Sequence, residues 1–174
     1  MESFEDIFMS GGHTNSLGRS AEVLANVLSD QPKIDELFRC IYSQDAWVRM
    51  RAIDTFEKII KVNPTWAEPY TDKLISELTQ KSQPSIQWHL AQLFTEIQLN
   101  VDQKEKVMLW LTDLLSSPDI DWIVSANAMI ALQFFYLQND INTQDFTTLL
   151  SIQSHHTSKS VRKKALSIMD SIIH

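Results

Sequence analysis

Histidines are the first residues of this chain to consider for chemistry, because imidazole binds metals and exchanges protons near neutral pH. His155 and His156 are adjacent, so they point in different directions on any regular element, and no cysteine or carboxylate stands beside them at a ligand spacing. His89 stands alone in its segment, His13 follows two glycines, and His174 is the last residue. The sequence therefore predicts no metal site.

The nucleophilic residues and paired carboxylates give no stronger indication of a catalytic site. The sequence contains no G-x-S-x-G elbow, H-E-x-x-H helix, phosphate-binding loop or C-x-x-C pair. Cys40 lies in an apolar run, as a small core residue would. Asp119 and Asp121 fall where a helix is expected to begin, and acidic side chains are favourable there. We interpret Asp45 and Arg49 as a turn-to-helix pair, so the sequence favours a protein without catalytic residues or a cofactor.

The composition describes a folded, acidic chain. Its 174 residues are 44% hydrophobic, and 15 basic against 22 acidic residues give a formal charge of −7. Nucleic-acid binding usually needs a concentrated positive patch, and basic residues cluster here only over 159–164, so we do not favour it. No apolar stretch approaches the ~20 residues that cross a bilayer. With a single cysteine as well, we expect a cytoplasmic protein that does not enter the membrane.

The elements that would position any site come from a short pattern that recurs four times. It begins at Val48, Ile86, Val124 and Val161, with spacings of 38, 38 and 37 residues. Apolar residues follow at offsets of four, seven or eight, and eleven, which form one stripe of a helix. Another apolar run precedes each helix, at 34–41, 70–78, 107–115 and 146–152, and a fixed period of this length is typical of stacked helix pairs. The stripe of Leu17 to Leu28 predicts an unpaired helix before them.

Two copies of the pattern have the form V-R-x-x-A, namely Val48-Arg49-x-x-Ala52, with Asp45 before it, and Val161-Arg162-x-x-Ala165. In this the chain resembles the HEAT-repeat family. The segments 16–19 and 83–89 are similar to those of bacterial HEAT-repeat proteins of unassigned activity. The second copy departs from the pattern, with Gln87 and Leu90 in place of arginine and alanine. The resemblance implies an all-α fold, a right-handed α-solenoid of about four antiparallel helix pairs preceded by one unpaired helix.

Domain organisation follows from the same repeats. A stack of repeats has no internal boundary, so we expect a single HEAT-like repeat domain over 14–174. Gly11 and Gly12 form a plausible hinge before it. The sequence thus predicts a flexible N-terminal arm over 1–13. The spacing of Asp102 and Glu105 nearly fits a capping box at the start of the first helix of the third pair.

A candidate partner-binding row lies at offset plus three of the four second helices. It consists of Arg51, His89, Asn127 and Lys164, which are polar throughout and never acidic. In HEAT-type pairs the second helices are expected to line the concave side. The row is therefore a candidate contact for an acidic peptide or a phosphate-bearing partner, and the alternative is an ordinary solvated ridge.

The third repeat differs from the other three at offsets plus six and plus ten of its second helix. It places Ile130 and Phe134 where the other repeats have polar residues, so the helix over 122–137 is apolar on nearly every side. Either the N-terminal arm covers this patch with its own apolar residues, or the patch binds another protein or a second copy.

From these features we predict a non-enzymatic scaffold or adaptor that binds a protein or peptide partner through its concave face. Two alternatives stay open by analogy with HEAT-like arrays. One is a DNA glycosylase or another nucleic-acid-binding protein. The other is an accessory subunit or a lyase-like chaperone for a cofactor. Fold alone does not decide among them.

Overall fold

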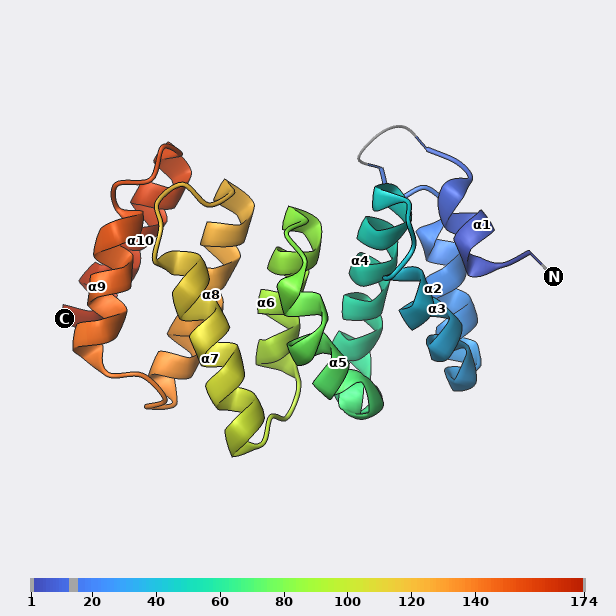
Figure 1. The fold of residues 1–174 in the computed structure, drawn as a ribbon, viewed down its shortest axis with the longest axis horizontal. Coiled ribbons are helices and arrows are strands. Elements are labelled where there is room, and N and C mark those ends of the chain that lie inside the picture. The colour runs from blue at the N-terminus through green and yellow to red at the C-terminus, as the bar shows by residue number, and fades with distance from the viewer. Residues whose placement is uncertain (1, 13–15, 174) are drawn as a thin grey trace. The chain divides into compact units, whose positions relative to one another are not determined.

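The computed structural model describes residues 2–12 and 16–173, and within them the chain is helical with no strand. The all-α expectation is therefore confirmed for this part of the chain (Figure 1). The α-helices are α1 (Phe4–Met9), α2 (Ser20–Ser29), α3 (Ile34–Cys40), α4 (Ala46–Val62), α5 (Thr71–Ser76), α6 (Pro84–Glu96), α7 (Val101–Leu115), α8 (Trp122–Leu137), α9 (Thr143–Gln153) and α10 (Lys159–Ile173). Three short 3-10 helices join them: η1 (Gln31–Lys33), η2 (Pro64–Tyr70) and η3 (Leu78–Gln80).

The predicted helices lie where the recurring pattern placed them. Helices α4, α6, α8 and α10 carry the four copies, and the residues that head them, Val48, Ile86, Val124 and Val161, are fully buried. The upstream runs form α3, α5, α7 and α9, and the helix expected before the pairs is α2. Burial of one stripe per helix is thus the local rule that the sequence encodes.

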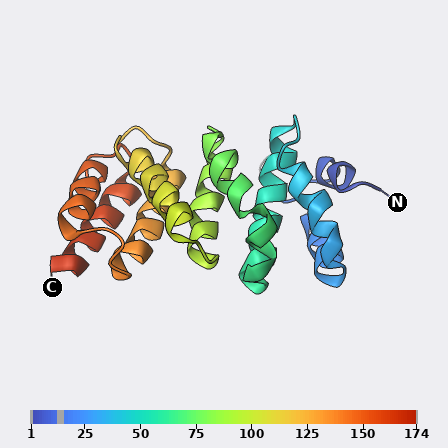
Figure 2. The same cartoon turned by 60° about the horizontal axis from the view of Figure 1, so that its bottom comes forward.

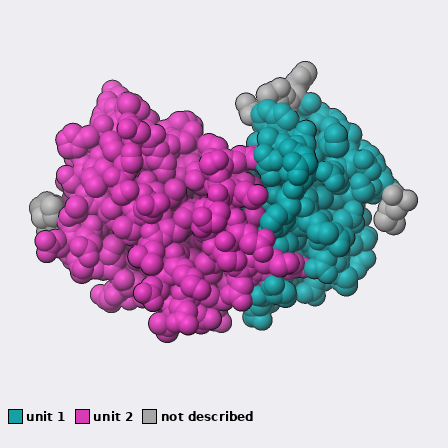
Figure 3. All heavy atoms as spheres, in the orientation of Figure 1, with its two compact units in different colours: residues 1–69 teal, residues 70–174 magenta. Residues whose placement is uncertain are grey.

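The chain divides into two compact units. Unit 1 spans residues 1–69 and unit 2 spans residues 70–174 (Figure 3). Each unit has its own buried core. In unit 1, the rings of Phe38 and Phe56 pack with centroids 5.4 Å apart. In unit 2, Phe94 and Trp110 pack edge to face at 5.7 Å.

The described residues of the predicted arm, 2–12, belong to unit 1. Residues 4–9 form α1, whose Phe4, Ile7 and Phe8 are buried where it packs against α2, α3 and α4. The Ser3 hydroxyl caps the helix by accepting from the Asp6 amide at 3.2 Å. Residues 1 and 13 of the predicted arm lie outside the described residues. The apolar side chains of this segment therefore pack on a surface within their own unit.

Hydrogen bonds at the starts of α4 and α10 show what the arginine of each V-R-x-x-A copy does. Asp45 caps α4 by accepting from the amides of Trp47 and Val48, at 2.7 and 3.1 Å. The Arg49 guanidinium donates to the carbonyls of the residues six and five positions before it, at 2.8 and 2.9 Å. Arg162 repeats this arrangement on α10, at 2.7 Å to both carbonyls. Both arginines therefore brace the turn that leads into their helix.

The capping box of α7 lies two residues earlier than predicted. The Asn100 side chain accepts from the Gln103 amide at 2.9 Å, and the Gln103 side chain accepts from the Asn100 amide at 3.0 Å. Helix α7 therefore begins at Val101, and Asp102 lies in its first turn.

Unit 2 consists of two rows of helices. Helix α8 packs between α6 and α10, while α7 packs on α8 and contacts α5 and α9 (Figures 1 and 2). The faces of α7 and α8 that meet are apolar and buried. The faces turned away from this core are those available for binding.

Candidate functional site

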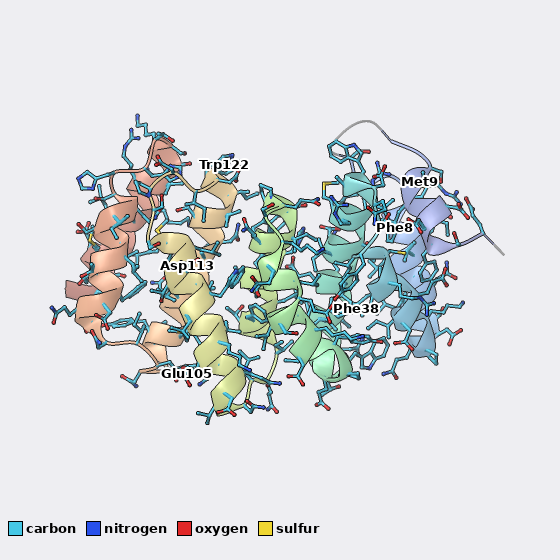
Figure 4. The ribbon with its side chains drawn as sticks, viewed as in Figure 1. Phe8, Met9, Phe38, Glu105, Asp113 and Trp122 are labelled. Atoms are coloured by element: carbon cyan, nitrogen blue, oxygen red, sulfur yellow. The ribbon has the colours of Figure 1, made fainter. Side chains whose placement is uncertain are left out.

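Helix α8 presents an apolar face that the described residues of unit 2 leave partly exposed. The helix contains no charged residue, and its core side is fully apolar except for Ser125. On the opposite side, Ile130 is 46% exposed, Phe134 39% and Leu137 73%, and Trp122 at the start of the helix is also exposed (Figure 4). The spacing of these four residues places them within one third of the helix circumference. We call them the α8 apolar face.

A groove of about 550 Å³ runs between this face and α10. We call it the α8–α10 groove. Helix α8 contributes Ile130 and Gln133, and the residues that line the other side come from α10: Ser160, Lys163, Lys164, Ser167, Ile168 and Ser171. These lining residues, all in the described part of the chain, include two ammonium groups and no carboxylate. The groove therefore combines the apolar side chains of Ile130 and Ile168 with serines and positive charge.

The sequence of α10 explains how the groove forms. Val161, Ala165 and Ile168 are buried against the neighbouring helices and fix the rotation of α10. The small side chains at Ser160, Ser167 and Ser171 then face α8 without filling the space between the two helices. Lys163 and Lys164 line the groove as well and bring positive charge to it.

The predicted polar row is not a continuous exposed surface. Arg51, in unit 1, is only 4% exposed, and its guanidinium donates to the carbonyls of Phe8 and Ser16, the latter at 2.9 Å. His89 is 2% exposed and stacks on the ring of Trp88. Offset plus three lies at the edge of the buried stripe, where neighbouring segments pack. These two positions therefore cannot form an accessible contact row.

The other two members of the row are more accessible. Asn127 is half-buried, accepts from the Gln92 side chain at 2.8 Å and donates to the Ile123 carbonyl at 2.8 Å. Lys164 lines the α8–α10 groove together with Ile130. The structure thus joins one residue of the polar row to one residue of the apolar patch, a combination that neither pattern alone predicted.

His155 and His156 make hydrogen bonds within the fold, and the thiol of Cys40 is buried. The buried His156 ring accepts from the Ser158 amide at 2.8 Å through Nδ1, and its Nε2 lies 2.7 Å from the Ile120 carbonyl. His155 contacts the Ser151 carbonyl at 2.9 Å. Burial raises the pKa of the Cys40 thiol to about 12, with Glu5 and Glu36 adding to the shift. His13 and His174 lie outside the described residues, and within the described ranges no three metal-binding side chains cluster.

The sequence did not point to Lys163 and Gln133 of the α8–α10 groove or to Leu137 of the α8 apolar face. Lys163 belonged to the basic cluster of α10 but was not assigned to the patch, and Gln133 and Leu137 were not singled out. Extending the repeat register would have found Leu137, which follows Phe134 on the same stripe. The serines of α10 carry no such signal, because only the approach of α8 makes them groove residues.

No family model, curated protein or solved structure matches the chain. In the described ranges, no helix, α8 included, combines the length and apolarity that crossing a bilayer requires.

Proposed function

We propose that this protein is a non-enzymatic, HEAT-type scaffold of the cytoplasm that binds a protein partner through the α8–α10 groove. The α8 apolar face carries the proposal. Contiguous apolar side chains on a water-facing surface usually mark an interaction site, and here they adjoin a groove with a defined charge. A bound protein would remove Ile130, Phe134 and Leu137 from water.

The repeat architecture in the proposal is a right-handed α-solenoid of four helix pairs that follow α2. Two observations support it. The heading residue of each copy is buried, and Arg49 and Arg162 make equivalent hydrogen bonds in copies more than a hundred residues apart. In such an array α4, α6, α8 and α10 are the inner helices, which agrees with the position of the groove on α8 and α10.

The nucleic-acid alternative has less support. Of the two cationic members of the predicted row, Arg51 is buried with its donors engaged by backbone carbonyls, which leaves Lys164. Two lysines in the groove provide less positive charge than a duplex-binding face usually carries. No observation favours a chaperone for a cofactor over a protein-binding scaffold.

Site-specific photocrosslinking tests the proposal. With p-benzoylphenylalanine at Ile130 or Leu137, irradiation of living cells should give a discrete adduct that mass spectrometry identifies. Placing the same group at Glu68, an exposed residue of η2, is the control and should give none. The identified protein should then bind the purified chain in isothermal titration calorimetry.

A double variant separates binding from folding. Ile130→Asp with Phe134→Ser should weaken that binding by about 30-fold or more, as expected for residues at the centre of an interface. It should leave the melting temperature nearly unchanged, because both side chains are exposed. If the variant unfolds unit 2, or if no adduct exceeds that at Glu68, the groove is not a binding site.

A further inference from the structure

Helix α7 carries an exposed ridge of three acidic residues and one leucine. Asp102, Glu105, Leu109 and Asp113 follow one another at helical spacing and are all exposed, with Leu109 64% accessible. Figure 4 labels Glu105 and Asp113 along α7, about two turns apart. The buried residues of α7 lie on the opposite side of the helix. We call these four residues the α7 ridge.

Leu109 projects between two hollows. One, of about 360 Å³, lies between α7 and α9 and is bounded by Glu105, Met108 and Leu149. The other, of about 490 Å³, lies between α5 and α7 and is bounded by Ile75, Trp110 and Asp113. Leu109 lines both. An exposed leucine with hollows on either side has the shape of a knob that can enter a complementary groove.

The α7 ridge matches the α8–α10 groove in both polarity and charge. The groove is lined by Ile130, Lys163 and Lys164 among others, and its lining residues include no carboxylate. The ridge has Leu109 with Glu105 one helical turn before it and Asp113 one turn after it, and the exposed Lys106 lies beside it. With Asp102 included, three carboxylates stand against one ammonium, so the ridge is acidic on balance. Placing Leu109 over Ile130 would bring opposite charges together on the rim, which steers association and fixes its register.

We propose that the groove binds the α7 ridge of a second copy of this chain. This inference rests on the proposed function, because it names the partner of the same groove. The ridge and the groove lie on opposite sides of the buried core between α7 and α8. Each molecule can therefore offer its ridge to one neighbour and its groove to another, which is a heterologous contact and extends head to tail.

Complementary single variants test the head-to-tail geometry. Leu109→Lys removes the ridge and leaves the groove, whereas Ile130→Asp removes the groove and leaves the ridge. Sedimentation velocity of the purified wild-type chain should show concentration-dependent association over the micromolar to millimolar range. Each variant alone should associate about 30-fold more weakly. An equimolar mixture of the two should form a dimer, because one intact ridge and one intact groove remain.

Matched controls use exposed apolar residues of the same helices. Val101→Lys on α7 and Leu166→Asp on α10 change residues that lie outside the ridge and the groove lining. Both should associate as the wild type does. Circular dichroism melting of every variant checks that the fold is kept. A charge exchange adds a second test: Glu105→Lys with Asp113→Lys should lose self-association and regain it when mixed with Lys163→Glu, Lys164→Glu chains.

Three results would overturn the inference. The wild type could stay monomeric at every concentration. Leu109→Lys could associate as the wild type does, which would indicate a symmetric contact between two α8 faces. The mixture could fail to recover the dimer although both variants are folded. If the in-cell adduct at Ile130 identifies another protein while the purified chain stays monomeric, this inference fails and the proposed function stands. If no adduct forms and the chain is monomeric, both fail.

Discussion

The hydroxyl of Ser125 donates a 2.7 Å hydrogen bond to the side-chain oxygen of Gln153, and both residues are fully buried. The side-chain nitrogen Nε2 of Gln153 donates to the backbone carbonyls of Leu115 and Ser117, at 2.9 and 2.8 Å. One side chain of α9 therefore joins the end of α7, the loop after it and the start of α8. This bond also explains why Ser125 can stand in the third copy where Arg49 and Arg162 stand in two others.

Removing the side-chain carboxamide of Gln153 should destabilise unit 2. Gln153→Ala leaves two backbone carbonyls and one hydroxyl buried without their partner, and an unsatisfied buried polar group costs about 1–3 kcal/mol. Urea unfolding followed by the fluorescence of Trp110 and Trp122 measures the loss. Gln144→Ala, at an exposed position of the same helix, should change the free energy of unfolding by less than about 0.5 kcal/mol. Equal effects of the two changes would contradict this account.

Arg51 should hold α1 on unit 1. Arg51→Met removes the donors that reach the Phe8 and Ser16 carbonyls, so the segment around residue 8 should open more often. Hydrogen exchange of the amides of Ile7 and Ser10, which are bonded within α1, should accelerate by about tenfold or more, since one lost buried bond costs about 1–3 kcal/mol. Arg39→Met, at an exposed position, should leave this exchange unchanged. Unaltered protection in Arg51→Met would show that apolar burial alone retains α1.

Arg162 should stabilise the start of α10, whereas its neighbour Lys163 should serve binding. Arg162→Lys keeps the charge but loses the planar guanidinium that reaches two carbonyls, so unit 2 should lose about 1 kcal/mol. Lys163→Ala should affect stability by less than about 0.5 kcal/mol and weaken association instead. Chemical denaturation and sedimentation of the same two proteins check both statements. If only Lys163→Ala lowers the free energy of unfolding, the structural role belongs to Lys163 and not to Arg162.

Cys40 should make stability depend on pH in the alkaline range. Its pKa is raised from 9.0 to about 12 by burial, so the folded state favours the neutral thiol. The thiol therefore supports folding fully below pH 9.0, and this contribution is lost as the pH rises from 9.0 through about 12. Denaturation of the wild type and of Cys40→Ala at pH 8 and pH 10.5 isolates the effect, because the wild type should lose more stability than the variant. At pH 8, the Cys40 thiol should react with a thiol reagent only when the chain unfolds.

The sequence by itself determined the helices and the side of each that is buried. Periodic apolar residues after Val48, Ile86, Val124 and Val161 are sufficient, because a helix that buries one stripe needs only the spacing of its own residues. The unusual apolarity of α8 was also readable, since Ile130 and Phe134 depart from a rule that the other copies obey. These are properties of single helices, for which local information is enough.

Only the tertiary structure decided which polar residues face water and which ones meet. Arg51 and Lys164 occupy the same offset in their copies, yet one is buried beneath α1 and the other lines the α8–α10 groove. The burial of Phe4, Ile7 and Phe8 in unit 1 likewise depends on a surface made by three other helices. The groove exists because small serines of α10 face the apolar side of α8, and the relation between two helices is not encoded in the period of either one.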